Sequence, residues 1–563
     1  MPVKSAKRSN DGNVSVLKDP LKQIRLNEAA AREFYAVGHW SNRTFYDVLK
    51  ARAASDPDRE VFKDSRHSLT YAELKARVER CAEFLRRQGI GRGDVVAVQL
   101  PNRIEFPVLM FSLELIGAVA NNLNPDFRSV EVEYILRVSQ AKAYLCASKD
   151  TKFDYLAMIG ALRPKLPSLD IVIPVDSESG DGPSFAEALK SGLPISERDQ
   201  VRMAPDEVMR LAFTSGTTGN PKGVMHSFNT TLCTAEVMNK NMKLTSADVL
   251  LVFMPVGLNS GYIQLLQVVM AGARAVLMER FNPAAALAII RSERVTAFVS
   301  PPTALVMLLQ VPDFASYNLN TLRLIRSGGA SASVETLRAI KAAVPAAIMN
   351  SYGMLETGFH AHTRPDDDFE TVVGTVGRVL DNMGLRIVDD AGRDVPFGEE
   401  GEILAYGPSL LLGYFNQPDA TAASFTSDGW FRTGDLGQFV DQAGNLRISG
   451  RRKEIINRAG KKYLPREIEE LLFQHPKVVD VAVIGIPDPR LGERNCACVI
   501  AKPGATLELP ELVEFLRGKV ADYKLPEQLV QMRAFPLTAT GKVMRSALVA
   551  EVSGDSGETG PKS

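Results

Sequence analysis

Strand-like and helical hydrophobic patterns alternate along most of this chain, and the alternation limits the folds available to it. Residues 68–75 begin with capping residues, and Leu74, Val78, Cys81 and Leu85 then follow at near-helical spacing. The apolar segment 94–100 comes next and is typical of a strand. Similar pairs recur at 284–293 with 297–300, and at 333–342 with 346–349. These repeated units predict an α/β fold whose parallel sheets are covered by helices on both faces.

The pattern changes near residue 450, where a charged segment precedes a second series of elements. With 563 residues the chain is long enough for several lobes. Beyond the charged segment we expect helices at 465–474 and 511–520, and strands at 478–484, 497–501 and 527–532. The resulting division is a disordered tail at 1–13, a large domain of helix-covered sheets at 14–449, a hinge at 450–453, a small α+β domain at 454–552 and a disordered tail at 553–563.

Charge and hydropathy argue against two classes of partner. The 66 basic and 66 acidic side chains cancel, so the chain lacks the basic excess of a nucleic-acid binder. The N-terminal residues carry charge without a following apolar segment, and the apolar stretch 106–120 is interrupted by Glu114 and is too short to span a bilayer. We therefore expect a cytoplasmic protein with no membrane span.

The five cysteines are odd in number and mostly scattered, which is untypical of a disulfide framework and favours a reducing compartment. Cys496 and Cys498 lack a second pair of Cys or His residues nearby. We interpret them as alternate residues on one face of a strand and expect no structural zinc.

The loop TSGTTGNPKG at 214–223 directly follows the apolar stretch 208–213. Backbone N–H groups of a Gly-rich turn, together with hydroxyls and Lys222, favour a polyphosphate, whereas a flexible surface turn is the plain alternative. The P-loop pattern requires Gly before the Lys and Ser or Thr after it, but Pro221 and Gly223 stand there. A P-loop kinase or ATPase is therefore disfavoured.

Five stretches together carry a family resemblance. The run LAFTSGTTGNPKGVMH at 211–226 resembles the phosphate loop of the adenylate-forming enzymes, which include acyl-CoA synthetases, luciferases and adenylation domains of peptide synthetases. SYGMLET at 351–357, GWFRTGDL at 429–436, GRRKE at 450–454 and PLTATGK at 536–542 follow in the family's order. The resemblance extends over roughly residues 40 to 548.

This resemblance implies roles for the matching residues. ATP or AMP would be bound by Thr214, Ser215, Gly216, Thr217, Thr218, Gly219, Lys222, Gly328, Gly329, Ala330, Ser351, Tyr352, Gly353, Asp435 and Arg451. In this set Asp435 and Arg451 hold the ribose and Tyr352 stacks on adenine. Thr214 and Glu356 match the magnesium site, and the implied catalytic residues are Lys542, Glu356 and Lys222. Attack of a carboxylate on the α-phosphate of ATP builds up negative charge, which these cations would stabilise.

The resemblance also implies that the small domain moves. Lys542 would enter the site for adenylation, a rotation at the hinge residue Lys453 would then withdraw it, and Gly460 would arrive for the thioester step with CoA. An isolated Lys in a turn, or a Gly such as Gly460, is ordinarily plain surface.

Two positions depart from the family pattern. Leu355 stands where the family has Thr and cannot donate a hydrogen bond to the α-phosphate, and Leu258 stands where many relatives carry His or an aromatic residue. The predicted acyl pocket comprises Leu258, Asn259, Ser260, Gly261 and Gly328. No Asp lies between Leu250 and Tyr262 to pair with an amino group. We interpret His226, His360 and His362 as core or surface residues.

The resemblance implies an acyl-CoA synthetase that activates a medium-chain, alicyclic or aromatic acid with ATP, Mg²⁺ and CoA. Two alternatives stay open: a ligase that loads a carrier protein, and a nucleotide-binding homologue without turnover. A homodimer is compatible with the resemblance, but no stretch of the sequence indicates one.

Overall fold

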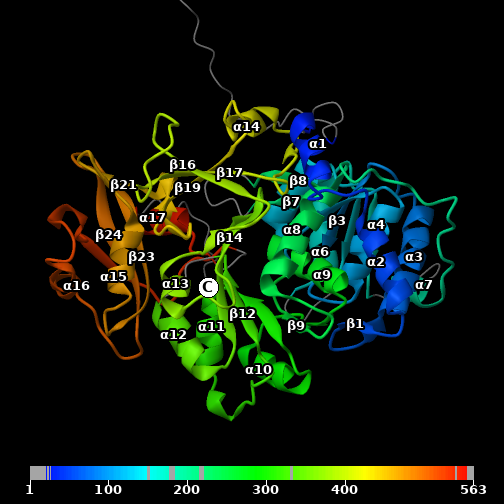
Figure 1. Ribbon diagram of the computed structural model, residues 1–563, viewed down its shortest axis with the longest axis horizontal. Coiled ribbons are helices and arrows are strands. Elements are labelled where there is room, and N and C mark those ends of the chain that lie inside the picture. Colours follow the sequence, from blue (N-terminus) through cyan, green and yellow to red (C-terminus); the bar gives the residue numbers. More distant parts are fainter. Residues whose placement is uncertain are drawn as a thin grey trace, which may run out of the picture.

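The computed structural model describes residues 21, 24–25, 27–148, 153–176, 184–214, 221–329, 334–538 and 542–553. Within these ranges the chain forms two large, mostly parallel sheets, a smaller antiparallel sheet and a separate C-terminal sheet. Figure 1 shows the C-terminal elements, in orange and red, beside the larger part of the molecule. The expected α/β fold with a large N-terminal and a small C-terminal domain is confirmed.

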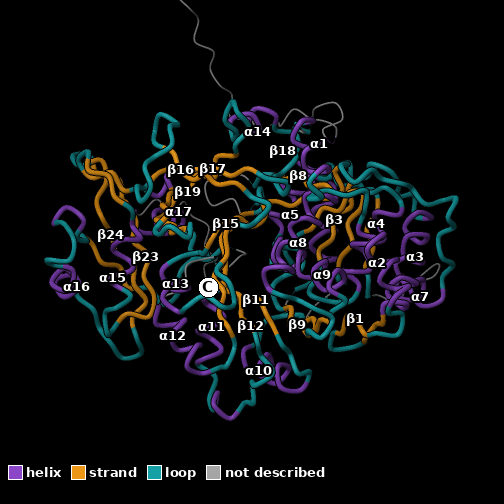
Figure 2. Tube along the Cα trace, viewed as in Figure 1, coloured by secondary structure: helices purple, strands orange, loops and turns teal. Residues whose placement is uncertain are grey.

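The first large sheet has seven strands. Its order is β18 (Gly413–Tyr414), β8 (Gly223–Ser227), β7 (Val208–Phe213), β4 (Val119–Asn122), β3 (Val95–Gln99), β5 (Ala143–Cys146) and β6 (Ile171–Pro174). The five strands from β7 to the β6 edge are parallel, while β8 and β18 at the other edge pair antiparallel. The helices of this part are α1 (Glu28–Ala36), α2 (Phe45–Ser55), α3 (Tyr71–Arg87), α4 (Glu105–Leu115), α5 (Ser129–Ser139), α6 (Tyr155–Leu162) and α7 (Phe185–Ser191). Figure 2 shows helices on either side of these strands.

The second large sheet has nine strands and antiparallel pairs at both edges. Its order is β15 (Arg378–Val379), β14 (Gly358–His362), β13 (Ala347–Met354), β12 (Leu324–Gly328), β11 (Ala297–Ser300), β9 (Val249–Val252), β10 (Arg274–Leu277), β1 (Glu60–Lys63) and β2 (Ser68–Thr70). The helices of this part are α8 (Phe228–Met242), α9 (Asn259–Ala271), α10 (Pro283–Ser292), α11 (Pro302–Leu309), α12 (Val334–Ala343) and α13 (Phe369–Gly374). Helices α8 and α9 are mostly buried and pack against each other, and α8 contacts both β8 and β14.

Local sequence signals account for the first predicted helix. Thr70 and Glu73 form a capping box at the start of α3, because each side chain accepts a hydrogen bond from the backbone N–H of the other residue. The predicted apolar face of α3, comprising Leu74, Val78, Cys81 and Leu85, is fully buried. The strands expected at 94–100, 297–300 and 346–349 are present as β3, β11 and the start of β13.

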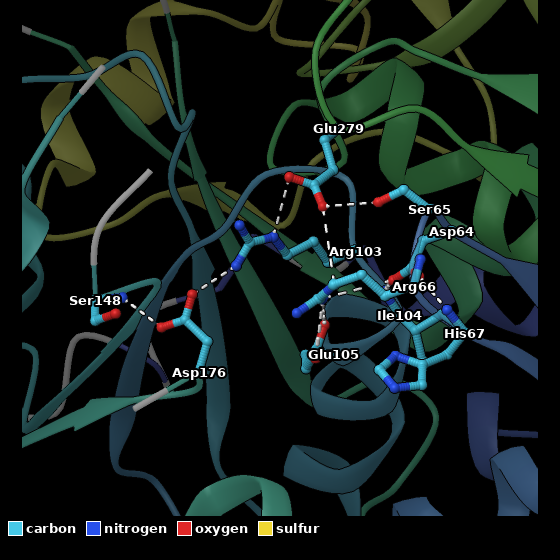
Figure 3. A network of polar contacts seen from close by, with 10 residues as sticks. All are labelled: Asp64, Ser65, Arg66, His67, Arg103, Ile104, Glu105, Ser148, Asp176 and Glu279. Carbon is cyan, nitrogen blue, oxygen red and sulfur yellow. Dashed lines mark hydrogen bonds and ion pairs between the residues drawn. The ribbon is translucent and has the colours of Figure 1, made fainter. Parts of the chain in front are cut away.

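A charged network joins the two large sheets beyond the carboxyl ends of their strands (Figure 3). Arg103, which follows β3, lies 2.6 Å from the Asp176 carboxylate and 3.3 Å from that of Glu279, which follows β10. The fully buried carboxylate of Asp64 accepts backbone hydrogen bonds from His67 at 2.8 Å and Ile104 at 3.1 Å. These contacts link the segments that follow β3 and β6 of the first sheet to those that follow β1 and β10 of the second.

The remaining strands form the antiparallel sheet and the C-terminal sheet. The first comprises β16 (Gly384–Val388), β17 (Gly401–Tyr406), β19 (Phe431–Phe439) and β20 (Leu446–Arg451), with α14 (Pro418–Ala423) nearby in the chain. The second comprises β22 (Lys461–Tyr463), β21 (Ile456–Arg458), β24 (Gly492–Ala501), β23 (Val478–Asp488) and β25 (Gln528–Gln531), with α15 (Pro465–Leu472), α16 (Leu509–Leu516) and α17 (Arg545–Ser553). The chain crosses from one sheet to the other after Arg451, where the sequence predicts the hinge.

Three C-terminal predictions need correction. The strand expected at 497–501 begins at Gly492, because its whole length pairs with β23. The helix expected at 511–520 is α16, which ends at Leu516, two residues before Gly518 with its positive φ of 76°. The sequence analysis did not predict α17, which extends to Ser553 and packs Leu548 against the sheet, so Ser553 belongs to a helix.

Cys496 and Cys498 occupy alternate positions of β24 and belong to the same buried cluster, as the strand interpretation predicted. All five cysteines are buried and unbridged. Across the described ranges, no three His, Cys, Asp or Glu side chains gather where they could hold a metal ion. No helix in these ranges is both long enough and apolar enough to cross a membrane.

Candidate active site

The end of the predicted phosphate loop lies beside the predicted magnesium ligand. The backbone N–H of Thr214 donates to the Lys222 carbonyl at 3.0 Å, and the Lys222 N–H donates to Thr214 Oγ1 at 3.1 Å. Lys222 Nζ lies 4.6 Å from the centre of the Tyr414 ring, and the Tyr414 hydroxyl donates to Glu356 Oε1 at 3.2 Å. Thr214, Lys222 and Glu356 therefore share one region. Ser215, Gly216, Thr217, Thr218 and Gly219 lie outside the described residues, as does Ala330.

Glu356 lies in the turn between β13 and β14, where no helix begins. Its backbone carbonyl accepts a hydrogen bond from Leu411 at 2.6 Å, which fixes the turn against the segment before β18. Burial raises the pKa of the Glu356 carboxyl, and the hydrogen bond from Tyr414 and the charge of Lys222 oppose this shift. A buried carboxylate beside a Lys and a Thr hydroxyl supplies the oxygen ligands that Mg²⁺ prefers.

Asp435 and Arg451 face each other across a pair of antiparallel strands. They are register partners on β19 and β20, and Arg451 Nε lies 3.0 Å from Asp435 Oδ1. The Tyr352 hydroxyl donates to Asp435 Oδ2 at 2.8 Å. Burial and the Asp435 charge raise the pKa of Tyr352, so its hydroxyl stays protonated and remains a donor. The structure thus brings together three residues predicted to bind the nucleoside.

Close contacts account for two of the predicted glycines, with a side chain at Gly328 and with backbone at Gly353. A Cβ on Gly328 would lie 2.5 Å from Ser351 Oγ, and one on Gly353 would lie 2.3 Å from the Gly358 carbonyl oxygen. Ser351 Oγ itself donates to the Ser327 carbonyl at 3.0 Å. Gly329 has a φ of 87°, which disfavours residues with a side chain. Gly328, Gly329 and Gly353 therefore leave this end of β12 and β13 without side chains at three positions.

Lys542 reaches the same site from the C-terminal domain. Its backbone N–H donates to Thr538 Oγ1 at 3.0 Å. Burial and then the positive charge of Arg451 lower the pKa of Lys542, while the carboxylates of Asp435 and Glu356 act in the opposite direction. The Lys542 ammonium group is therefore close enough to Arg451, Asp435 and Glu356 for their charges to act on it.

The predicted hinge residue, Lys453, lies at the junction of the two domains, and the predicted thioester residue, Gly460, lies in the first turn of the small domain. Lys453 lies in a short 3₁₀ turn after β20, and burial followed by the charge of Arg451 lowers its pKa. Gly460 and Ala459 both have positive φ, 82° and 52°, and form the two-residue turn between β21 and β22. Gly460 is exposed, and a Cβ there would meet nothing within 4 Å. The turn is thus free to approach another surface if the domain rotates.

The predicted acyl-pocket residues lie at the start of α9. Leu258, Asn259 and Ser260 are partly exposed, with Leu258 at the N-cap. A Cβ on Gly261 would lie 2.4 Å from the Pro255 carbonyl oxygen, so the close backbone contact accounts for this glycine. Asn259 Oδ1 accepts a hydrogen bond from Arg210 Nη1 at 2.9 Å.

The sequence analysis missed Arg210 and Tyr414. Arg210 was read as part of an apolar stretch, although a single Arg inside a strand that is otherwise apolar is itself a signal. Tyr414 carried no such signal, because its role depends on the pairing of β18 with β8 and on the turn that holds Glu356. The place of each residue in the site depends on a contact with a distant segment of the chain: Arg210 with Asn259, and Tyr414 with Glu356.

The three predicted non-ligand histidines are core residues. His226 donates from Nε2 to the Leu355 carbonyl at 2.8 Å, while its Nδ1 lies 3.1 Å from Thr230 Oγ1. Burial lowers the pKa of His226 to about 4 and that of His360 to about 3, and also lowers that of His362. The Leu355 side chain packs against an apolar cluster, so this departure from the family pattern is part of the core around Tyr414.

Comparison with known proteins identifies the class of protein. The family model described as AMP-binding enzyme matches residues 49–415, and the model for the C-terminal domain of AMP-binding enzymes matches residues 467–542. The chain belongs to this adenylate-forming superfamily and is an adenylate-forming acid ligase.

Individual relatives place the chain among both CoA ligases and AMP ligases. It is 32% identical to the medium-chain fatty-acid–CoA ligase of Escherichia coli (strain K12), over 94% of each chain. It is 35% identical to the salicyl-AMP ligase / salicyl-S-ArCP synthetase of Mycobacterium tuberculosis (strain ATCC 25618 / H37Rv), over 93% of each chain. The crystal structure of ATP-bound MatB from Rhodopseudomonas palustris superposes with a TM-score of 0.82 at 28% identity, covering 90% of this chain and 99% of that one.

Proposed function

We propose that this chain is an acyl-CoA synthetase, which converts a carboxylic acid, ATP and CoA into acyl-CoA, AMP and pyrophosphate. The observation that supports this most directly is that Lys542, from a different domain, lies within reach of the charges of the paired Asp435 and Arg451 and of Glu356. A cation delivered to this point would stabilise the negative charge that develops when the carboxylate attacks the α-phosphate.

In the first half-reaction the paired residues hold the nucleotide. Asp435 offers carboxylate oxygens to the ribose diol, with Arg451 on its other side, while Tyr352 lies against the base. The Thr214 hydroxyl and Lys222 face the phosphates. Glu356 and Thr214 would hold Mg²⁺, which would neutralise phosphate charge. The oxygen atom of the acid forms the bond to the α-phosphorus, and pyrophosphate leaves with the electrons of the broken P–O bond.

In the second half-reaction the small domain rotates about Lys453 and exchanges Lys542 for the turn that carries Gly460. The CoA thiol then attacks the acyl carbon, and AMP leaves. This sequence requires motion because one small domain cannot present both segments at the same place.

The acid itself is proposed to be neutral beyond its carboxylate and medium-chain, alicyclic or aromatic. Leu258 gives an apolar entrance, and Asn259 is the polar group at the start of α9. The likeness to a medium-chain fatty-acid–CoA ligase and to a salicyl-AMP ligase supports this range of acids. A cytoplasmic location and a possible homodimer belong to the same proposal.

The test is pyrophosphate release with ATP and Mg²⁺ against a panel of short, medium, branched, alicyclic and aromatic acids, each with and without CoA. Turnover that depends on CoA supports the synthetase. Pyrophosphate released once per enzyme without turnover on CoA, followed by transfer to a carrier protein's pantetheine thiol, would support the second candidate, which the 35% identity to a salicyl-AMP ligase / salicyl-S-ArCP synthetase favours. ATP binding without pyrophosphate release from any acid would overturn both.

A further inference from the structure

A short N-terminal strap packs against the large domain, ahead of the stretch 49–415 that the family model matches. We define this N-terminal strap as residues 27–41, which comprise α1 and the turn after it. Trp40 is 4% exposed, and its ring lies 5.2 Å from that of Phe34 in a small apolar cluster with Cys233 of α8. The Trp40 backbone N–H donates to the Phe34 carbonyl at 3.0 Å. The strap therefore fixes the position of the indole ring.

The strap region holds both ends of a segment that lies beside the predicted active site. Trp40 Nε1 donates a hydrogen bond to the Pro408 carbonyl at 2.9 Å. The backbone N–H of Arg25, just ahead of the strap, donates to the Leu412 carbonyl at 2.7 Å. These two carbonyls are at the ends of residues 408–412, which we call the support segment. A buried carbonyl needs a donor, so these two N–H groups fix the support segment at both ends.

Between its two ends, the support segment contacts the turn that contains Glu356. The Leu411 N–H donates to the Glu356 carbonyl at 2.6 Å, and Ser409 Oγ donates to the Thr357 carbonyl at 2.8 Å. A Cβ on Gly358 would lie only 3.2 Å from the Ser409 Cβ, so the turn and the support segment are in close contact. A displacement of the support segment would therefore move the turn with it.

We propose that Trp40 is a positioning residue that acts through the support segment and keeps the Glu356 carboxylate oriented for the divalent cation that accompanies ATP. Mg²⁺ requires near-ideal geometry from its oxygen ligands, so a turn that is free to shift would present this carboxylate poorly. The inference rests on the part of the proposed function that places ATP and the cation at Glu356. It does not depend on which acid is activated.

Binding of Mn²⁺–ATP to the full chain tests this role without turnover. The acid is left out, so that no adenylate forms, and electron paramagnetic resonance of Mn²⁺ gives the Kd. Trp40→Phe keeps an aromatic ring in the cluster but removes the indole N–H. We expect this variant to raise the Kd for Mn²⁺–ATP about fivefold, the value of one hydrogen bond. The affinity for ATP without a divalent cation, measured by calorimetry, should be unchanged.

A matched pair of variants at Arg25 tests the other end of the support segment. Arg25→Pro removes the N–H that donates to Leu412 and should weaken Mn²⁺–ATP binding to a similar extent. Arg25→Ala keeps this N–H and loses only the side chain, whose guanidinium lies 3.8 Å from the centre of the Phe425 ring. It should leave the Kd for Mn²⁺–ATP unchanged.

Tyr35→Phe is the control for the stability of the strap. The Tyr35 hydroxyl donates to Asp206 Oδ2 at 2.9 Å, so this variant loses a strap hydrogen bond to a segment other than the support segment. It should lower the thermal midpoint without changing the Kd for Mn²⁺–ATP. In steady-state assays, Trp40→Phe should raise the KM for Mg²⁺ about fivefold and leave kcat at saturating Mg²⁺ close to the wild-type value.

An unchanged Kd for Mn²⁺–ATP in Trp40→Phe would overturn the inference. So would an equal rise in Tyr35→Phe, because the strap would then act only through stability. If Trp40→Phe fails to fold, the comparison of Arg25→Pro with Arg25→Ala decides the question in the same way. Failure of every acid to release pyrophosphate, with Mn²⁺–ATP bound as expected, would overturn the synthetase and leave this inference in place. Absence of Mn²⁺–ATP binding by the wild-type chain would overturn both.

Discussion

Charged groups are treated in opposite ways in two regions of this molecule. Around the nucleotide site, Asp435 forms an ion pair with Arg451 and accepts a hydrogen bond from the Tyr352 hydroxyl. Glu356 accepts a hydrogen bond from the Tyr414 hydroxyl. Deeper in the large domain, Arg210 and Arg326 are almost completely buried with no carboxylate partner among the described residues. The Arg326 guanidinium instead lies 4.5 Å from the centre of the Phe359 ring and contacts Met238 Sδ.

The charged side chains of the first region surround the proposed nucleotide site, whereas Arg210 and Arg326 contact only other parts of the protein. A site that must receive ATP can hold paired groups, because hydrogen bonds and ion pairs offset their desolvation. An unpaired buried guanidinium costs stability unless it does something that an apolar side chain cannot. Arg210 keeps one hydrogen bond, to the Asn259 side chain at the start of α9. The pKa of Arg326 is lowered to about 9 by burial, and within the part of the chain that the structure describes its guanidinium contacts Met238 and Phe359.

The largest expected effect lies in the paired region. Lys542→Ala should reduce adenylation about 10² to 10³-fold, because a charge placed at the developing negative charge is lost. Thioester formation from a supplied acyl-adenylate should persist. Separate assays of the two half-reactions measure this, with the exposed Lys502→Ala as the control. Equal loss of both half-reactions would contradict the division of roles.

A smaller effect is expected from Asp435→Asn. Removing one charged partner weakens the hydrogen bonds to the ribose, so KM for ATP should rise about tenfold with a smaller change in kcat. Steady-state kinetics measure this, and Asp419→Asn, at an exposed position on α14, is the control. An unchanged KM would remove Asp435 from the nucleotide site.

A change at the hinge should impair thioester formation rather than adenylation, the opposite of the Lys542 variant. Lys453→Pro fixes φ and should slow thioester formation on the order of tenfold while adenylation is largely kept, because the observed arrangement already contains Lys542. Lys453→Ala removes the side chain but leaves the rotation free and should show no such bias. Equal slowing of both steps in the Pro variant would argue against a hinge at this residue.

The smallest effect is expected in the unpaired region. Arg326→Met replaces a buried charge by an apolar side chain of similar length and should raise the thermal midpoint by about 1 to 3 °C. Arg291→Met, at an exposed position on α10, should leave it unchanged. A large fall in the thermal midpoint of Arg326→Met would show that Arg326 is stabilised by contacts other than those described. The contrast between paired and unpaired buried charges would then be wrong.

Much of the fold follows from local pattern. Helix α3 has its capping box and its buried face where the sequence places them, and the strands of the large sheets match apolar segments. Helix α17 was missed because its apolar residues Leu548, Val549 and Val552 gain a partner only when the sheet of Cys496 and Cys498 lies beneath them. Short apolar runs of this kind do not reveal in advance which surface will cover them.

The sequence by itself determined the class of the protein and the residues of its nucleotide motifs, because each motif is short and continuous in the chain. Only the tertiary structure decided which of them meet. It brought Lys542 of the small domain within reach of the charges of Asp435 and Glu356, placed Tyr414 between Lys222 and Glu356, and joined Arg210 to Asn259. The reason is physical: hydrogen bonds and charges act over a few ångströms of space, and the segments that carry these residues are far apart in the chain.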